Sequence, residues 1–261
     1  GRAYGYIYDP GKEILEFAKE VFCLFLCENA LDFTAYPSLL KIENDLVSMI
    51  RKHVHGDDQV VGNFTSGGTE SIFLAVKAAR DYYRQEKPEI KEPEMILPSS
   101  AHAAFHKAAH YLGIKTVTVS VDPDTFKADL KQTRESISEN TIFMVGSAPT
   151  YTQGVVDPIR ELSEMAHEND IWFHTDACMG GFLLPYFKRL GESVADFDFS
   201  LPGVCSVSVD LHKYAYSPKG ASLVFHRSPK LRSFQIFSFT KWLGYTLVNS
   251  TVQSTKSGGP L

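Results

Sequence analysis

The chain has 261 residues, with 26 Lys and Arg against 31 Asp and Glu, which gives a formal net charge of −5. Hydrophobic residues make up 44% and charged residues 22%, which is typical of a soluble globular protein and excludes a disordered or fibrous one. No basic run or charge surplus is present to neutralise phosphates, so nothing indicates a nucleic-acid partner. The length predicts one large domain and a remainder.

Residues 1–58 are predicted to form a helical arm, with helices at 13–27 and 39–53. The longest apolar run, 21–27, is too short to cross a bilayer, so no transmembrane anchor is expected in this chain. Cys23 and Cys27 are four residues apart and would share one helix face, where we expect them to be buried thiols. Four cysteines in so long a chain favour a reducing, cytoplasmic-type compartment.

Residues 59–246 alternate between short β-rich runs and longer helical ones, and are predicted to form the large domain. Strands are expected at 95–97, 116–121, 142–145, 171–173, 204–209 and 222–225, and helices at 71–85, 101–112, 130–138 and 159–168. Gly113 is expected to end the second of these helices, and Asp157 to cap the last, with Pro158 as its first residue. The alternation predicts an α/β fold with a largely parallel sheet, whose ligands gather at the carboxyl ends of the strands. Residues 247–261 lack this pattern and are interpreted as a linker.

The segment TSGGTES, residues 65–71, leads directly into a predicted helix. Glycines let the backbone approach an anion, and the amides of a helix N-terminus donate to it, so Gly67, Gly68 and Thr69 could cradle a phosphate. The alternative is an ordinary glycine-rich turn before a helix.

Two further residues follow predicted strands. Asp176, in HTDA, could hold a proton on a pyridine nitrogen, or it could cap the turn at Gly180. Lys213, after His212 in SVDLHKY, is a candidate nucleophile for an aldehyde, or a solvated lysine. A phosphate loop, a carboxylate and a lysine in this order predict a pyridoxal phosphate site.

His102 lies where a predicted strand turns into a helix, and its ring could stack on such a cofactor; a capping or exposed histidine is the alternative. His106 and His110 continue one helical stripe. No carboxylate or cysteine accompanies the stripe, so no metal site is expected.

The segments TSGGTES, SSAHAAFHKAA, HTDACMGGF and SVDLHKYAYSPKG together resemble the group II decarboxylase superfamily of pyridoxal phosphate enzymes. Within it, AHAAFHKAA, QGVVDPI and the D-x-H-K-Y-x-Y-x-P-K-G pattern are most similar to the sphingosine-1-phosphate lyases. The resemblance covers nearly the whole chain. It implies the type I pyridoxal phosphate-dependent transferase fold, in which helices flank a mostly parallel seven-stranded sheet. The small C-terminal domain of that fold would be largely absent here, with residues 247–261 leading into it.

The resemblance also implies roles for individual residues. Lys213 would carry pyridoxal 5′-phosphate covalently, Asp176 would bind its ring nitrogen, and His102 and Ala177 would lie against its two ring faces. Its phosphate would be held by Gly67, Gly68, Thr69 and His212. The substrate would meet Lys219, Tyr151 and Asn29, the last in a segment that tends to reach a neighbouring subunit of a homodimer with shared active sites.

The implied reaction is a retro-aldol cleavage of a phosphorylated sphingoid base to a long-chain aldehyde and phosphoethanolamine. Two alternatives are an amino-acid decarboxylase of the same superfamily and a homologue that binds pyridoxal phosphate without turnover. One departure concerns substrate binding: Asp32 stands where the family usually has a histidine near the substrate phosphate.

Overall fold

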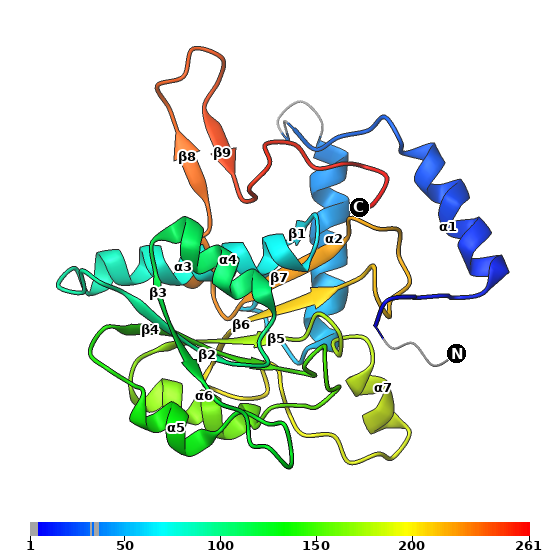
Figure 1. Ribbon diagram of the computed structural model, residues 1–261. Coiled ribbons are helices and arrows are strands. Elements are labelled where there is room, and N and C mark those ends of the chain that lie inside the picture. Colours follow the sequence, from blue (N-terminus) through cyan, green and yellow to red (C-terminus); the bar gives the residue numbers. More distant parts are fainter. Residues whose placement is uncertain (1–4, 32, 34–36) are drawn as a thin grey trace.

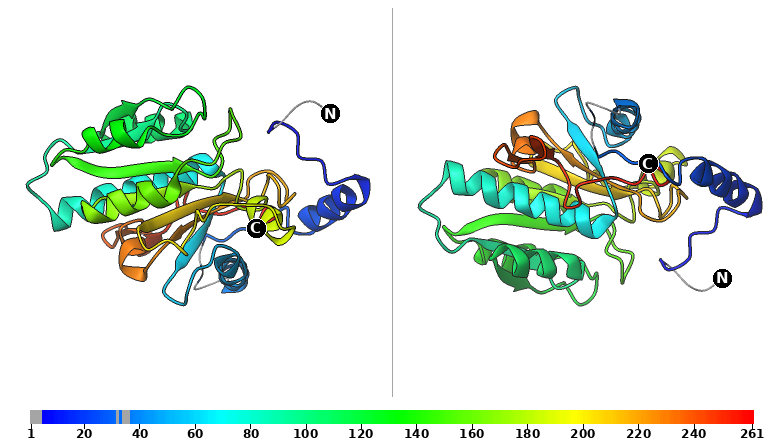
Figure 2. Two further views of the ribbon diagram at one scale, coloured as in Figure 1. Left: turned by 90° about the horizontal axis from the view of Figure 1, so that it is seen from below. Right: turned by 90° about the horizontal axis from the view of Figure 1, so that it is seen from above.

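The computed structural model describes residues 5–31, 33 and 37–261, so Asp32 lies outside the described residues. Its centre is a seven-stranded sheet with helices on both faces (Figures 1 and 2). The strands of this sheet are β1 (Val61–Thr65), β2 (Glu94–Pro98), β3 (Lys115–Val119), β4 (Thr141–Ser147), β5 (Trp172–Asp176), β6 (Val204–Asp210) and β7 (Ser222–His226).

The strand order is β1-β7-β6-β5-β4-β2-β3, and every neighbouring pair is parallel except the two that involve β7. The expected mostly parallel sheet is therefore confirmed. β1 was not among the expected strands, because Val61–Thr65 places Gly62 and Asn63 inside a five-residue run and weakens its apolar signal. The residues that follow β1, β4, β5 and β6 meet at one edge of the sheet.

The helices agree with the expected segments in position more closely than in their ends. They are α1 (Lys12–Leu24), α2 (Pro37–His53), α3 (Gly68–Glu86), α4 (Ala103–Leu112), α5 (Leu130–Glu135), α6 (Ile159–Glu168), α7 (Leu184–Arg189) and α8 (Pro229–Ser233). Gly113 ends α4 in the left-handed conformation, with φ 66°. The short helices α7 and α8 carry too little apolar periodicity to be predicted.

The expectation that Asp157 caps α6 is wrong. The helix begins at Ile159 after Pro158, and no side chain caps it. The Asp157 carboxylate instead accepts hydrogen bonds from the backbone N–H groups of Ala128 (2.9 Å) and Ser147 (2.8 Å). A buried carboxylate takes the donors that the fold brings to it, so Asp157 joins the end of β4 to the segment before α5.

Two apolar clusters fill the space between the sheet and its helices. On one face, Val76 of α3 and Phe105 of α4 pack with Trp172 of β5. On the other face, Ile159 of α6 packs with Val207 of β6, and α2 adds partly buried side chains. Both faces of the sheet are thus covered, as parallel strands require. No helix among the described residues is long and apolar enough to span a bilayer.

The arm differs from expectation. In Figure 1, α1 stands away from the sheet, and none of its residues is buried. Cys23 and Cys27 are both exposed, so the predicted burial of these thiols is wrong. The helix ends at Leu24, which leaves Cys27 beyond it, and the apolar side of α1 has little of the chain to pack against.

Residues 247–261 return to the body of the molecule. The hairpin of β8 (Phe237–Phe239) and β9 (Leu247–Asn249) projects from it (Figure 1), and the chain then crosses back to the arm. Lys256 forms an ion pair with the buried Glu43 of α2, and the Gly258 N–H donates to the carbonyl of Glu28 (2.8 Å). The division at 58 and 246 stays a prediction.

Candidate active site

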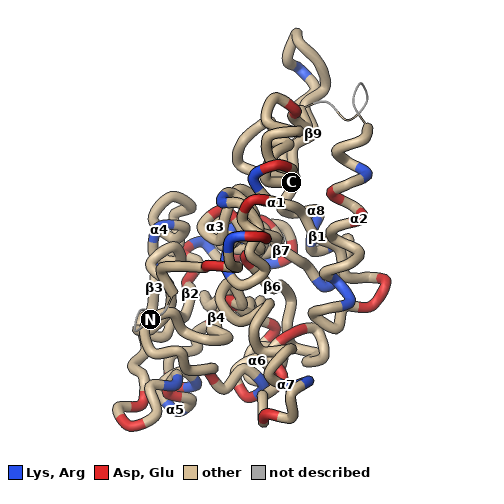
Figure 3. The backbone as a smooth tube through the Cα atoms, turned by 90° about the vertical axis from the view of Figure 1, so that its right-hand side faces the viewer, with Lys and Arg blue, Asp and Glu red and all other residues tan. Residues whose placement is uncertain are grey.

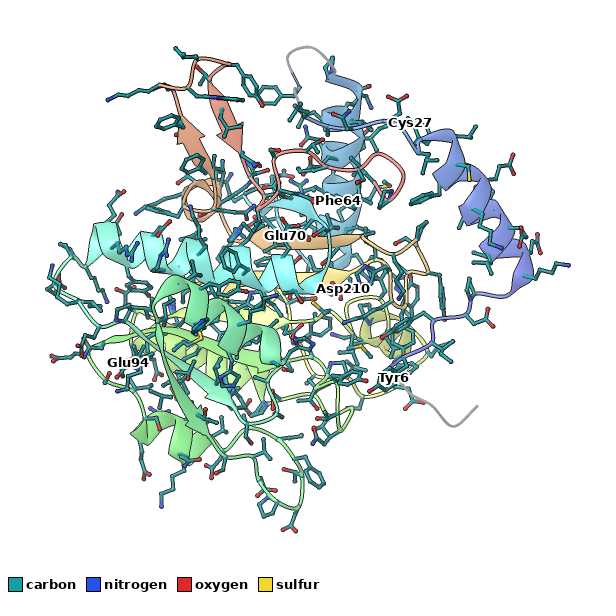
Figure 4. The ribbon with its side chains drawn as sticks, turned by 45° about the horizontal axis from the view of Figure 1, so that its top comes forward. Tyr6, Cys27, Phe64, Glu70, Glu94 and Asp210 are labelled. Carbon is teal, nitrogen blue, oxygen red and sulfur yellow. The ribbon has the colours of Figure 1, made fainter. Side chains whose placement is uncertain are left out.

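A cavity of about 520 Å³ lies at the edge of the sheet where β1, β4, β5 and β6 end. Most of the residues singled out from the sequence line it, although they come from distant parts of the chain. These are Gly67, Gly68, Thr69, His102, Tyr151, Asp176, His212, Lys213 and Lys219. In Figure 4, Glu70 and Asp210 mark this edge near the start of α3.

The glycine loop joins β1 to the N-terminus of α3. No side chain caps that terminus, and the N–H groups of Gly68 and Thr69 make no hydrogen bond within the described part of the chain. Glu70 holds the glycine loop in place, because its carboxylate accepts hydrogen bonds from the N–H (2.6 Å) and the hydroxyl (2.8 Å) of Ser66. The Ser66 hydroxyl proton is therefore engaged, and the helix amides are the groups left to hold an anion.

Lys213 points its ammonium at Asp210, with Nζ 2.8 Å from Oδ2. Burial lowers the pKa of Lys213, but the nearby carboxylates of Asp210 and Asp176 outweigh this and raise that pKa above its usual range. Sequence reasoning missed Asp210, although it also ends a β-rich run and lies three residues before the lysine. Its Oδ1 is buried without a hydrogen bond in the structure.

His212 lies between the glycine loop and the lysine. Its Nδ1 accepts from the Ala221 N–H (3.1 Å), so the ring proton is on Nε2, which is 3.6 Å from Asp210 Oδ2. Burial lowers the pKa of His212. A Cβ added to Gly67 would lie 3.5 Å from the His212 ring, which places the ring against the loop.

Asp176 ends β5 and is almost fully buried. Its Oδ1 accepts from the Cys178 N–H (3.1 Å) and from the Ser208 hydroxyl (3.5 Å). Oδ1 thus caps the turn that follows β5, which is the alternative interpretation of Asp176. Asp176 nevertheless lines the cavity, and within the described residues no hydrogen bond reaches Oδ2.

His102 both caps a helix and faces the cavity. Its Nδ1 accepts from the Ala104 N–H (3.1 Å) at the start of α4. This places the ring proton on Nε2 and fixes the ring at the cavity wall. His106 and His110 are exposed, and no group of three metal-binding side chains comes together among the described residues.

Lys219 and Tyr151 also line the cavity. Lys219 Nζ donates to the carbonyl of His212 (3.0 Å) and lies 4.6 Å from the centre of the Tyr8 ring. The Tyr6 and Tyr151 rings meet edge to face, and a hydrogen bond with Tyr6 raises the pKa of Tyr151 to about 12. Tyr6 and Tyr8 belong to the arm, so the arm forms part of this wall.

Two expected residues do not line the cavity. Ala177 is fully buried just below it, where its N–H donates to the Ser208 carbonyl (3.0 Å). Asn29 pairs with Ser257, and its side chain accepts from the Leu31 N–H (3.1 Å). Its expected contact with substrate, through a neighbouring subunit, stays a prediction.

The residues present fit pyridoxal phosphate. The uncapped start of α3 and the ring Nε2–H of His212 supply donors for a phosphate. Lys213 lines the same cavity and can bond to an aldehyde. Asp176 lines the cavity, and its Oδ2 is left as a hydrogen-bond acceptor. A Cβ at Gly68 would lie 2.8 Å from Asp210 Oδ2 and 2.9 Å from Cys178 Sγ, so the backbone here leaves no room for a side chain.

Sequence comparison supports this interpretation. Residues 5–246 match the family described as pyridoxal-dependent decarboxylase conserved domain. The chain is 42% identical to the sphingosine-1-phosphate lyase of Arabidopsis thaliana over 99% of its length and 48% of that protein. It is 38% identical to a probable L-aspartate decarboxylase of Pyrococcus furiosus, over 93% of this chain and 64% of that protein. The chain thus spans about half the length of the first of these relatives.

Solved structures agree on the fold. The sphingosine-1-phosphate lyase of Burkholderia pseudomallei superposes with a TM-score of 0.95 at 39% identity, covering 99% of this chain and 61% of that one. The glutamate decarboxylase of Lactobacillus brevis gives a TM-score of 0.84 at 22% identity, covering 98% and 59% of the two chains. The second likeness shows the fold alone, which is the expected fold of pyridoxal phosphate enzymes.

Proposed function

The chain belongs to the family of pyridoxal-dependent decarboxylases, and from this premise we propose that its cavity binds pyridoxal 5′-phosphate and cleaves a phosphorylated sphingoid base. Lys213 would hold the cofactor covalently, and Asp176 would bind its ring nitrogen. The start of α3, with His212, would bind its phosphate, and His102 would lie against its ring. When bound, the cofactor supplies an aldehyde that bonds to amines and a ring that withdraws electrons from the neighbouring bond.

The observation that favours a phosphorylated substrate is a second cation at the cavity. Gly68, Thr69 and His212 already account for one phosphate, and Lys219 lines the same cavity beyond Lys213. Its ammonium donates to the carbonyl of His212 and lies over the ring of Tyr8. No carboxylate among the described residues forms an ion pair with it. A lysine with this surrounding suits an anionic ligand, here the phosphate of the substrate.

The proposed reaction is a retro-aldol cleavage. The substrate carries an amine on carbon 2 and a hydroxyl on carbon 3. The hydroxyl proton leaves to a base, the bond between carbons 2 and 3 breaks, and carbon 2 gains a proton. The products are a long-chain aldehyde and phosphoethanolamine. Lys213 Nζ, once released by the substrate amine, is the candidate base because it lines the cavity.

Product analysis tests the proposed reaction. Purified protein loaded with pyridoxal phosphate is incubated with sphingosine 1-phosphate, and products are identified by mass spectrometry. We expect a long-chain aldehyde and phosphoethanolamine in equal amounts, and neither product with Lys213→Ala. Intact substrate, together with a spectrum of lysine-bound cofactor, would support a binding protein without turnover.

An amino-acid decarboxylase is the second candidate, favoured by the 38% identity to the probable L-aspartate decarboxylase. The same cavity would serve it, with Lys219 facing a substrate carboxylate. Release of carbon dioxide from aspartate or glutamate, without cleavage of sphingosine 1-phosphate, would establish this function instead.

We also propose that the protein acts as a homodimer that shares its active sites. α1 and the β8–β9 hairpin expose apolar side chains on parts that project from the body, including Phe17 (65%), Leu24 (71%) and Trp242 (52%). A second copy that covers these surfaces would also give Asn29 a route to the neighbouring cavity. Sedimentation equilibrium should give twice the chain mass, and a monomer with full activity would contradict the proposal.

A further inference from the structure

A line of polar side chains runs through the buried centre of the sheet. Trp172 and His174 of β5, and Ser206 and Ser208 of β6, are all at most 1% exposed. Polar groups buried this deeply are costly unless each finds a partner. These four do, and together they lead to the carboxylate of Asp176.

The first half of the line has a defined direction. The indole N–H of Trp172 donates to Ser206 Oγ (2.8 Å), and tryptophan can only donate. Ser206 Oγ is also 2.8 Å from His174 Nδ1. Ser206 Oγ accepts from Trp172 and keeps one hydroxyl proton, which can be donated to an unprotonated Nδ1.

The second half agrees with this direction. Ser208 Oγ lies 3.1 Å from His174 Nε2, 3.3 Å from Cys178 Sγ and 3.5 Å from Asp176 Oδ1. An ionised carboxylate only accepts, so the single proton of Ser208 goes to Asp176. Ser208 then accepts from the Cys178 thiol and from an N–H at His174 Nε2. That assignment is the neutral tautomer with its proton on Nε2, and the Ser206 hydroxyl can donate to the Nδ1 that this tautomer leaves unprotonated.

Burial keeps the His174 ring and the Cys178 thiol uncharged. Burial lowers the pKa of His174 to about 3, and burial raises the pKa of the Cys178 thiol. Each therefore acts as a fixed donor at neutral pH. The chain of donors and the Cys178 N–H meet at Oδ1 of Asp176, while Oδ2 of this cavity-lining residue accepts no hydrogen bond from the described residues.

We propose that His174 and Ser208 are positioning residues, which orient the Asp176 carboxylate so that Oδ2 faces the protonated ring nitrogen of the cofactor. The inference rests on the proposed function, because it assigns a purpose to residues around the same cofactor. It predicts that removal of the Ser208 hydroxyl frees the carboxylate to rotate. The cofactor would then be held less tightly, and its ring nitrogen would lose its proton at a lower pH.

The test compares Ser208→Ala with Ser222→Ala, which removes an equally buried hydroxyl of β7 that contacts Ser71 and the Val209 carbonyl instead. For Ser208→Ala we expect the dissociation constant of pyridoxal phosphate to rise about three- to tenfold. We also expect the pH dependence of the bound cofactor's absorbance to shift, while Ser222→Ala leaves both unchanged. Nitrogen NMR of cofactor-free protein should show His174 neutral, with its proton on Nε2, from pH 8 to 5.

The outcomes separate the two claims. Normal cofactor affinity and an unshifted absorbance profile in Ser208→Ala would overturn the positioning role and leave the proposed function intact. Wild-type protein that takes up no cofactor would overturn both. A His174 that carries its proton on Nδ1, or is charged at pH 6, would overturn the hydrogen-bond chain whether or not the cofactor binds.

Discussion

Asp176 and Asp210 end adjacent strands at the same edge of the sheet, yet their neighbours give them different roles. Asp210 Oδ2 lies 2.8 Å from the Lys213 ammonium, whereas Asp176 is held by Cys178 and Ser208 and forms no ion pair among the described residues. Asp210 thus acts on the lysine, which leaves Asp176 available for its proposed contact with the cofactor. The distinction depends on the side chains across the strand pair, which spacing along the chain does not reveal.

Asp210→Asn should speed the attachment of pyridoxal phosphate near neutral pH. A lysine must be uncharged to attack an aldehyde, and Asp210 is one of the groups that raise the pKa of Lys213. The rate should rise about tenfold for each unit by which this pKa falls. Stopped-flow absorbance measures it, with Asp45→Asn on the exposed side of α2 as the control. A slower reaction in the variant would show that the carboxylate assists the attachment.

Lys219→Ala should raise the KM for sphingosine 1-phosphate by about tenfold, because a charged hydrogen bond to the substrate phosphate is lost. The absorbance of the lysine-bound cofactor should stay the same, since Lys219 lies beyond the residues assigned to the cofactor phosphate. Lys131→Ala on α5, whose side chain is 85% exposed, is the matched control. An unchanged KM would remove the phosphate role of Lys219.

At the scale of elements, two glycines at helix ends serve different purposes, and alanine should separate them. In Gly68→Ala the new Cβ would press on Asp210 and Cys178, so we expect cofactor affinity to fall at least about tenfold. In Gly113→Ala nothing lies within 4 Å, but φ is +66°, so we expect a stability loss of about 1 kcal/mol. Equilibrium dialysis and urea denaturation measure the two effects, and equal losses of cofactor affinity would contradict the distinction.

The buried histidines of β5 and β7 should make the sheet sensitive to acid. Burial lowers the pKa of His174 to about 3 and that of His226 to about 4 in the folded chain, from 6.5. Below pH 6.5 the unfolded chain takes up protons that the folded one does not, so stability falls as pH falls. At pH 5 each histidine should account for about 2 kcal/mol. His226→Gln should reduce the stability that is lost between pH 7.5 and 5. A loss of stability identical to that of the unmodified protein would contradict this assignment.

The sequence was most informative where a local rule operates alone. The helical pattern predicted α6 near 159–168, where it lies, with Pro158 just before its first residue, and Gly113 ends α4 as a left-handed cap should. The predictions that were wrong depended on contacts between distant segments. Asp157 accepts from backbone donors of two other segments, and Cys23 has no neighbouring segment that buries it. The short β1 strand is recognisable through its pairing with β7, a contact between residues far apart in the chain.

At the scale of the whole molecule, the arm and residues 247–261 are held together by direct contacts. Lys256 reaches Glu43 in the interior, and Gly258 packs on Glu28 of the arm. Glu70 links this region to the glycine loop, because its Oε1 accepts from the Val252 N–H (2.8 Å). Acidic and basic residues are interspersed over the chain (Figure 3), so the ion pairs that matter here are local.

The cavity as a whole could be predicted further than its details. The sequence placed a phosphate loop, a carboxylate and a lysine at strand ends, and one fold edge brings all three together. It did not reveal Asp210 as the lysine's partner or the engagement of Ser66 by Glu70. Each of these depends on a hydrogen bond whose direction is set by the folded backbone.

Reduction with borohydride tests the central claim most directly, namely that this cavity carries pyridoxal phosphate on Lys213. The protein is incubated with the cofactor, reduced, digested and mapped by mass spectrometry. We expect one modified peptide, labelled at Lys213 and absent from Lys213→Ala, with Lys219 unmodified. Labelling at Lys219, equal labelling of surface lysines, or no label at all would contradict it.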